Sequence, residues 1–157
     1  MPADMMRLVL FQPEIAANVG AVLRSAACFG AEVDIVEPCG FPLGAKGLRR
    51  AAMDYADAAQ PKLHSSWTAF NAGRDKNARL VLLTTKAEQT LWDFDFAAND
   101  QLILGQESAG VPDEVRAIAD AAVKIPLAAT ARSLNVGVAG AVALAEARRQ
   151  VGWTTPS

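Results

Sequence analysis

The sequence predicts an α/β fold with a mostly parallel sheet and helices on both of its faces. Five segments are short and almost continuously apolar, which is typical of parallel strands covered on both sides. Segments with the helical spacing of apolar residues lie between them, and strands that alternate with helices indicate a doubly wound domain. The chain has 157 residues, enough for one such domain with a substantial core.

The expected strands share an apolar, mostly β-branched or leucine-rich composition. They are residues 7–11 (RLVLF), 32–36 (EVDIV), 79–83 (RLVLL), 101–104 (QLIL) and 122–125 (AVKI). The helices are expected at residues 18–29, 65–72, 112–118 and about 133–149. At the start of the first helix, Asn18 is a suitable N-cap and Gly20 opens the first turn. The third helix begins with a proline, a common first-turn residue.

The last predicted helix has an unusual composition. Residues 136–147 (VGVAGAVALAEA) contain one polar residue, Glu146, and every side of the helix is small. Gly137 and Gly140 each cost about 1 kcal/mol relative to alanine inside a helix, so we expect another backbone to approach closely there. A helix that is apolar all round should be buried all round, either within the sheet layers or against a second subunit.

Composition and charge describe an ordinary globular protein. The chain is 52% hydrophobic and 20% charged, with a net charge of -2 and a pI of about 5.4. A general nucleic-acid binder is usually strongly basic, so any polyanion site must be local. We expect a single domain over residues 1–157. Residues 1–5 are a possible extension, because Met5 and Met6 are alternative starts.

Few residues here suit metal or redox chemistry. Cys28 and Cys39 form no Cys-x-x-Cys pair and lie close to apolar stretches, which indicates a reducing compartment and buried thiols. His64 is the single histidine, so we expect no metal site. A histidine-centred catalytic triad is likewise excluded, except one that uses His64. The apolar part of the first eleven residues is too short for a signal peptide and no run is as long as a membrane span, so a cytoplasmic location is expected.

Three loops are expected where ligands bind in open α/β sheets, at the carboxyl ends of the strands. The first (QPEIAANVGAVLRSA) has neither the dinucleotide-binding nor the P-loop glycine pattern. In it Arg24 flanks the apolar helix face, and periodicity alone favours a solvated arginine. The second (LILGQESAGVP) places Glu107 between Gly105 and Gly110. This loop is either a surface turn or a ligand loop whose glycines let the backbone approach a bound molecule.

The third loop (IPLAATARSLNVG) introduces the small-sided helix. Ser133 is explained as its N-cap. Asn135 is harder to explain, because an amide in the first turn of so apolar a helix must find hydrogen-bond partners.

Taken in order, the patterns N-x-G-x-x-x-R, G-x-E-x-x-G-V-P and I-P…S-L-N resemble the three motifs of the SPOUT class of RNA methyltransferases. From about residue 6 to 153 the chain is similar to the small bacterial subfamily that methylates the 2′-hydroxyl of the tRNA wobble nucleotide. Further matches are VEPCGFPL, LRRAAMDY and LLTTK. The resemblance implies a deep trefoil knot at the carboxyl end, S-adenosylmethionine as cofactor, and a homodimer through the terminal helices. General rules of chain topology would not predict a knot.

The resemblance also assigns the cofactor pocket. It implies that Leu83, Gly105, Ile125 and Ser133 line the S-adenosylmethionine pocket, largely through backbone groups. The glycines of the second loop would then let the main chain approach the cofactor.

For catalysis the resemblance implies Arg24 at the acceptor ribose, Glu107 orienting its loop or the acceptor, and Asn18 and Asn135 holding loops and acceptor. Methyl transfer needs alignment more than charge stabilisation, and no metal. The family is thought to use the arginine as a base. Arginine keeps its proton, so holding a phosphate beside the hydroxyl is the better physical role.

For tRNA contact the candidates are Lys46, Arg49, Arg50 and Arg132, with Lys86 as a further one. A solvated basic patch is the simpler interpretation of these charges. Without an appended RNA-binding domain, the dimer itself would have to hold the anticodon stem-loop. The alternatives are a 2′-O-methyltransferase for another RNA, such as rRNA or another tRNA position, and a non-catalytic RNA-binding relative.

Overall fold

The computed structural model describes residues 6–42 and 60–153. In these ranges one sheet has the strand order β3-β2-β1-β5-β4-β6, and every pairing in it is parallel. The strands are β1 (Arg7–Phe11), β2 (Glu32–Val36), β3 (Lys62–His64), β4 (Leu80–Leu83), β5 (Gln101–Leu104) and β6 (Ala121–Val123). The expected α/β fold with a parallel sheet is confirmed.

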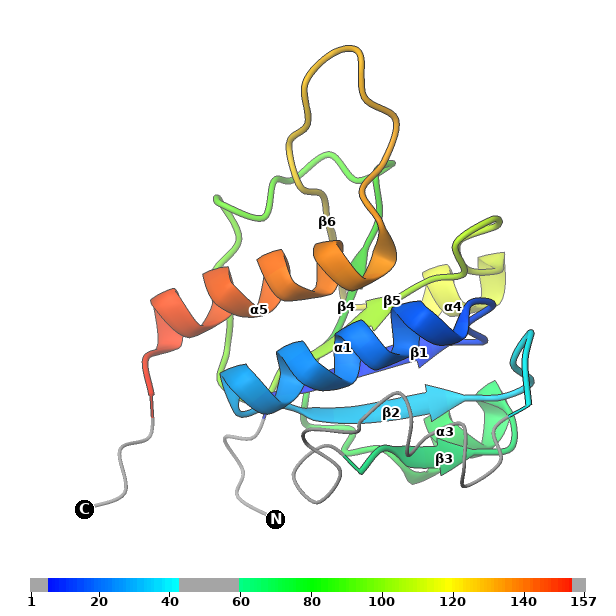
Figure 1. Cartoon of the computed structure of the whole chain (residues 1–157). Helices are drawn as coiled ribbons and strands as arrows, with labels where there is room; N and C mark the ends of the chain where they lie inside the picture. Colours follow the sequence, from blue (N-terminus) through cyan, green and yellow to red (C-terminus); the bar gives the residue numbers. More distant parts are fainter. Residues whose placement is uncertain (1–5, 43–59, 154–157) are drawn as a thin grey trace.

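Helices cover both faces of the sheet (Figure 1). They are α1 (Ala16–Phe29), α3 (Trp67–Gly73), α4 (Asp113–Ile118) and α5 (Val136–Val151). Helices α1 and α5 lie side by side on one face and pack on each other. Helices α3 and α4 contribute Trp67, Phe70 and Val115 to the core of the opposite face.

The central strand β1 explains why its sequence is almost continuously apolar. Leu8 and Leu10 point into the core beneath α1 and α5, whereas Val9 and Phe11 point into the core beneath α3 and α4. Side chains alternate between the faces of a strand, so a sheet covered on both sides needs apolar residues at successive positions.

The short edge strand β3 has no counterpart among the predicted strands. Only three residues long, it is mostly exposed, so it carries no apolar run to detect. Its register is Asp34 opposite Lys62 and Val36 opposite His64. The His64 ring nitrogen Nε2 lies 2.7 Å from Asp34 Oδ1, which ties this edge to β2.

The predicted starts of both long helices were wrong. Helix α1 begins at Ala16 after Ile15, which makes no side-chain cap, and Asn18 is buried inside the helix. Helix α5 begins at Val136, and its N-cap is Asn135 instead of Ser133. The Asn135 side chain accepts hydrogen bonds from Gly137 N at 2.8 Å and Val138 N at 3.3 Å. Composition alone shows neither starting position, because α1 begins without a side-chain cap and α5 is capped by Asn135.

Within one chain helix α5 is not buried all round, so only the expected burial against a second subunit stays a prediction. Its inner face packs on α1 and the sheet, while Val138 is 50% exposed. A Cβ added at Gly140 would lie 3.0 Å from Leu104 Cδ1, and one at Gly137 would lie 2.8 Å from Ala21 Cβ. The glycines therefore allow close packing within the chain, mostly against side chains.

The expectation of two buried thiols was wrong for Cys28, which is exposed on α1. Cys39 is partly buried. Burial, and then the carboxylates of Glu37 and Glu107, raise the pKa of the Cys39 thiol to about 11. Cys39 is therefore a neutral thiol at physiological pH, unsuited to nucleophilic chemistry.

Candidate functional site

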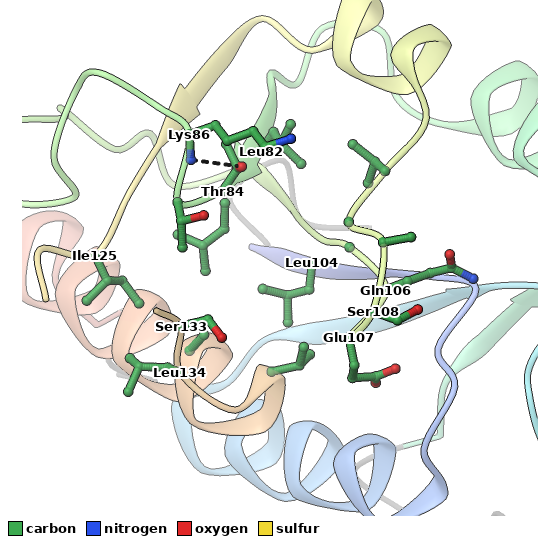
Figure 2. Close-up of a pocket in the computed structure, with 18 of the residues that line it drawn as sticks. Leu82, Thr84, Lys86, Leu104, Gln106, Glu107, Ser108, Ile125, Ser133 and Leu134 are labelled. Atoms are coloured by element: carbon green, nitrogen blue, oxygen red, sulfur yellow. Dashed lines mark hydrogen bonds between the residues drawn. The ribbon is translucent and has the colours of Figure 1, made fainter. Parts of the chain in front are cut away.

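A cavity of about 330 Å³ lies at the carboxyl ends of β4 and β5. Its walls come from residues 82–86, residues 104–111, and positions between 125 and 139 that lead into α5; Arg116 of α4 adds a charged side chain. Figure 2 shows Gln106, Glu107 and Ser108 on one side of this cavity and Ile125, Ser133 and Leu134 on the other. The position agrees with the general rule for ligand sites in open parallel sheets.

The four residues that sequence resemblance assigned to a cofactor all line this one cavity: Leu83, Gly105, Ile125 and Ser133. They come from three segments that are far apart in the sequence. Leu83 ends β4, Gly105 follows β5, and Ile125 and Ser133 lie in the connection from β6 to α5. The structure brings these positions together in one cavity wall.

The glycines of the second loop serve the loop's own closure. Gln106 and Gly110 exchange two backbone hydrogen bonds, of 2.8 and 3.0 Å, so that residues 106–110 form a tight turn. A Cβ at position 105 would lie 2.7 Å from the carbonyl carbon of Gly110, which itself has a φ of +66°. This segment is thus both a turn and a wall of the cavity.

Glu107 connects the second loop to the first. Its Oε2 accepts a hydrogen bond from the backbone N–H of Glu14 at 2.9 Å, and its Oε1 accepts a longer one, 3.4 Å, from Asn18 Nδ2. Asn18 Oδ1 in turn accepts from Asn135 Nδ2 at 2.9 Å. The expectation that the Asn135 amide needs partners is confirmed. Glu107, Asn18 and Asn135 form one network that joins all three loops.

Arg24 lies apart from the cavity wall. It is exposed near the middle of α1 and is not among the residues that line the cavity. Helix α1 leads away from the carboxyl ends of the strands, and Arg24 is six residues beyond Asn18, about 9 Å along the helix axis. The structure therefore brings together Asn18, Glu107 and Asn135 but not Arg24.

Two of the expected RNA-binding cations lie in the part of the chain that the structure describes. Arg132 is exposed in the connection before α5, whereas Lys86 lines the cavity. Lys46, Arg49 and Arg50 lie outside the described residues.

Three residues near the cavity escaped the sequence reasoning. Arg116 and Ser108 line it, and Glu14 accepts hydrogen bonds from Ser108. Glu14 and Ser108 follow the carboxyl ends of β1 and β5, so polar residues at strand exits were the available signal. Arg116 follows the Gly-Val-Pro segment by one helical turn and had no signal of its own.

Among residues 6–42 and 60–153, no group of three or more His, Cys, Asp or Glu could hold a metal ion. None of the helices described is both long and apolar enough to cross a membrane.

Fold and site define an α/β domain with a cavity at the carboxyl ends of parallel strands, the usual place of ligand sites in open α/β sheets. The model of the SpoU rRNA Methylase family matches residues 5–145, and the chain belongs to this family. A tRNA (cytidine(34)-2'-O)-methyltransferase of Beijerinckia indica is 53% identical over 146 residues, which span 92% of this chain and 91% of that protein.

Solved structures agree with this assignment. One described as "Structural insights into the 2-OH methylation of C/U34 on tRNA" is 40% identical with a TM-score of 0.85, and covers 94% of this chain and 91% of its own. The SpoU methyltransferase AviRb from Streptomyces viridochromogenes, in complex with AdoMet, is 26% identical with a TM-score of 0.81. That match covers 96% of this chain and 62% of AviRb.

Proposed function

We propose that this protein transfers a methyl group from S-adenosylmethionine to the ribose 2′-hydroxyl of the wobble nucleotide, position 34, in the anticodon loop of tRNA. The observation that carries the proposal is the meeting of three separate loops in one network beside one cavity. Family membership and the named relatives support the same reaction.

The cavity suits the proposed cofactor. Its volume lies within the range of about 300–1,000 Å³ that is usual for small-molecule sites. Leu82, Leu104 and Ile125 offer apolar surface for a flat base. Lys86 and Arg116 carry positive charge for a carboxylate, and Gly105 lines the cavity beside them. AdoMet-bound relatives support this assignment, in which Leu83, Gly105, Ile125 and Ser133 hold the cofactor.

The reaction needs an aligned hydroxyl. When bound, S-adenosylmethionine would supply a methyl carbon on a positively charged sulfur as the electrophile for the ribose oxygen, with S-adenosylhomocysteine as the leaving group and water as the acceptor of the hydroxyl proton. Glu107, held by Glu14 and Asn18, keeps its loop in place beside the acceptor. Arg24 holds a phosphate next to the hydroxyl, because its planar cation binds phosphate in a bidentate manner and keeps its own proton.

A homodimer through α1 and α5 is part of the proposal. The two helices lie side by side, and apolar residues remain exposed on them or next to them, among them Ile15 at 48% and Val138 at 50%. We propose that in such a dimer Arg24, which does not line the cavity of its own chain, acts at the cavity of the second chain. We assign the enzyme to the cytoplasm, where tRNA is available, and tRNA contact to Lys46, Arg49, Arg50 and Arg132, with Lys86 at the cavity.

We also propose the trefoil knot, with the chain after β6 passing through the connection between β4 and β5. That connection contacts both ends of the threaded segment. Lys124 exchanges backbone hydrogen bonds with Gln89 (3.0 Å) and Leu91 (2.7 Å). Near the end of α5, the Gln150 side chain donates to Phe94 O at 2.8 Å and accepts from Phe96 N at 2.9 Å. An experimental structure traced through residues 84–100 and 121–135 tests this path.

Mass spectrometry of tRNA tests the function directly. Cells that lack this gene should lose a ribose methyl at position 34, and purified protein should restore it with labelled S-adenosylmethionine in the presence of a chelator. Labelling of rRNA, or of another tRNA position, would favour a different RNA substrate. Binding of RNA without methyl transfer, or without cofactor binding by calorimetry, would favour a non-catalytic relative.

A further inference from the structure

We propose that Glu14 is a positioning residue for this enzyme: it holds loop 106–110 in the shape that binds the cofactor. The inference rests on the proposed function. Glu14 does not line the cavity itself, whereas Glu107 and Ser108 do. Any effect of Glu14 on the cofactor must therefore pass through these two residues.

Glu14 binds two successive loop residues with both its main chain and its side chain. Its backbone N–H donates to Glu107 Oε2 at 2.9 Å. Its Oε1 accepts from Ser108 N at 2.9 Å, and the Ser108 hydroxyl lies 2.8 Å from Oε1 and 2.9 Å from Oε2. The hydrogen bonds from Ser108, first from its backbone N–H, lower the pKa of Glu14. Glu14 is thus ionised at neutral pH, and these are charge-assisted hydrogen bonds.

Loop 106–110 needs contacts with another segment to fix its position. Its base is closed by the Gln106–Gly110 hydrogen bonds, but Ser108 and Ala109 at its tip are exposed and have no place in either hydrophobic core. The first apolar anchor after the tip is Val111. Polar contacts with the segment after β1 therefore determine where the tip lies. They include Gln106 Nε2, which donates to Gln12 O at 3.2 Å.

The segment that carries Glu14 is itself fixed from the side of β2. Gln12 is the one residue other than glycine with positive φ (44°) in the described ranges, and its N–H donates to Val36 O at 2.8 Å. Gly40 N donates to Pro13 O at 2.9 Å, and a Cβ at Gly40 would lie 2.9 Å from Glu14 O. A sparsely populated backbone conformation such as that of Gln12 persists where surrounding contacts stabilise it. The segment after β2 thus supports the segment after β1. That segment in turn supports the loop after β5, which forms a wall of the cavity.

Calorimetric titration with S-adenosylhomocysteine, at a temperature where circular dichroism shows each variant to be folded, tests the proposal. Glu14→Ala should raise the Kd about tenfold, since it removes the charge-assisted bonds to Ser108. Glu14→Gln keeps an acceptor oxygen of the same reach, and it should bring the Kd back to within about threefold of wild type. In steady-state kinetics the KM for the cofactor should rise with the Kd. Asp75→Ala is the matched control, because Asp75 also accepts an exposed backbone hydrogen bond, but from Asn77, which does not line the cavity as Ser108 does.

Several outcomes would overturn the proposal. The first is a folded Glu14→Ala protein with a Kd within twofold of wild type; the second is a Glu14→Gln variant as weak as Glu14→Ala. Where Glu14→Ala does not fold, Ser108→Ala decides: its side chain is exposed, so the fold should persist and the Kd should rise about threefold. An unchanged Kd there would also refute the proposal. Wild-type protein that binds no cofactor would instead refute the proposed function, so the two failures are distinguishable.

Discussion

The Asn135 side chain donates from Nδ2 to Asn18 Oδ1 at 2.9 Å while its own Oδ1 caps α5. One amide therefore closes the first turn of the last helix and joins it to a buried residue of the first helix, 117 positions earlier. Asn18 continues the chain of hydrogen bonds to Glu107 at the cavity. The geometry of the loops around the cavity thus depends on side chains that are not themselves in the cavity wall.

Two substitutions of Asn135 separate its role as the N-cap of α5 from its hydrogen bond to Asn18. Asn135→Asp keeps an oxygen that can cap α5 but loses the donor to Asn18, so we expect a loss of about 1 kcal/mol in the free energy of unfolding. Asn135→Ala loses both functions and should cost about 2–3 kcal/mol. Urea denaturation at pH 7 measures both. Equal losses for the two variants would show that the contact with Asn18 contributes nothing to stability.

A leucine at Gly140 should destabilise the folded chain itself. Its side chain would meet Leu104, Leu8 and Val22, and overpacking of this kind costs about 1–3 kcal/mol. Val138→Arg is the matched variant, since Val138 lies on the same helix but is half exposed. We expect it to keep the unfolding free energy of the monomer and to shift the proposed dimer toward monomer in analytical ultracentrifugation. A Gly140→Leu variant with the unfolding free energy of wild type would show that Gly140 does not pack tightly against Leu104.

Much of the fold could be predicted because burial determines the pattern of strands. Residues 7–11 and 101–104 are apolar at successive positions since both of their faces are covered, and this property is visible without a structure. The edge strand Lys62–His64 was missed because exposure leaves no such pattern. The start of α1 was placed too late because Asn18, a residue type common at N-caps, is used here for a tertiary contact.

The site was predictable only in part, for a similar reason. Motif positions such as Gly105 and Ser133 could be matched one by one, and they meet in the cavity. Glu14 carries only the weak signal of a polar residue after a strand, and Arg116 carries none, because their neighbours come from segments that only the folded topology brings near. Arg24 shows the reverse case: its motif is clear in the sequence, but its own chain does not place it at the cavity.

Arg116 is expected to recognise the carboxylate of the cofactor's amino-acid tail. It lines the cavity, and its ion pair with the exposed Asp113, at 3.3 Å, contributes little to stability. Arg116→Gln should weaken binding of S-adenosylmethionine about tenfold and leave the binding of its decarboxylated analogue nearly unchanged. Calorimetry with both compounds measures the difference. An equal loss for both would assign Arg116 to the shape of the cavity instead.

Glu146 should make stability depend on acid pH. It is buried on α5, and hydrogen bonds from Arg149 and then Gln150 lower its pKa from 4.5 to about 2. The lowered value means that its stabilising effect is fully present above pH 4.5 and is lost as the pH falls toward 2. Glu146→Gln should therefore be less stable than wild type at pH 7, and this difference should shrink between pH 4.5 and 2. Denaturation curves across that range would show a constant difference if the carboxylate were not stabilised by its partners.

Arg24 should serve the chemistry of the proposed reaction and not the fold. It lies on the exposed side of α1, and alanine is the better helix former, so Arg24→Ala should melt like wild type. Cofactor affinity should also persist, because Arg24 does not line the cavity. Single-turnover transfer of labelled methyl to unmodified tRNA should fall by orders of magnitude. Arg24→Lys should recover little of it, since an ammonium does not reproduce a planar bidentate grip on phosphate.

A mixed dimer then identifies the cavity that Arg24 serves. We would pair Arg24→Ala with Ile125→Trp, which fills the cavity, on two chains that carry different affinity tags. If Arg24 acts on the cavity of the second chain, the Arg24→Ala chain keeps an open cavity and receives the arginine of its partner. The purified mixed dimer should then regain about half of wild-type transfer, because one of its two sites is complete. If Arg24 acts within its own chain, neither site is complete and the mixed dimer should stay inactive. Near-normal transfer by the Arg24→Ala homodimer would refute the catalytic role altogether.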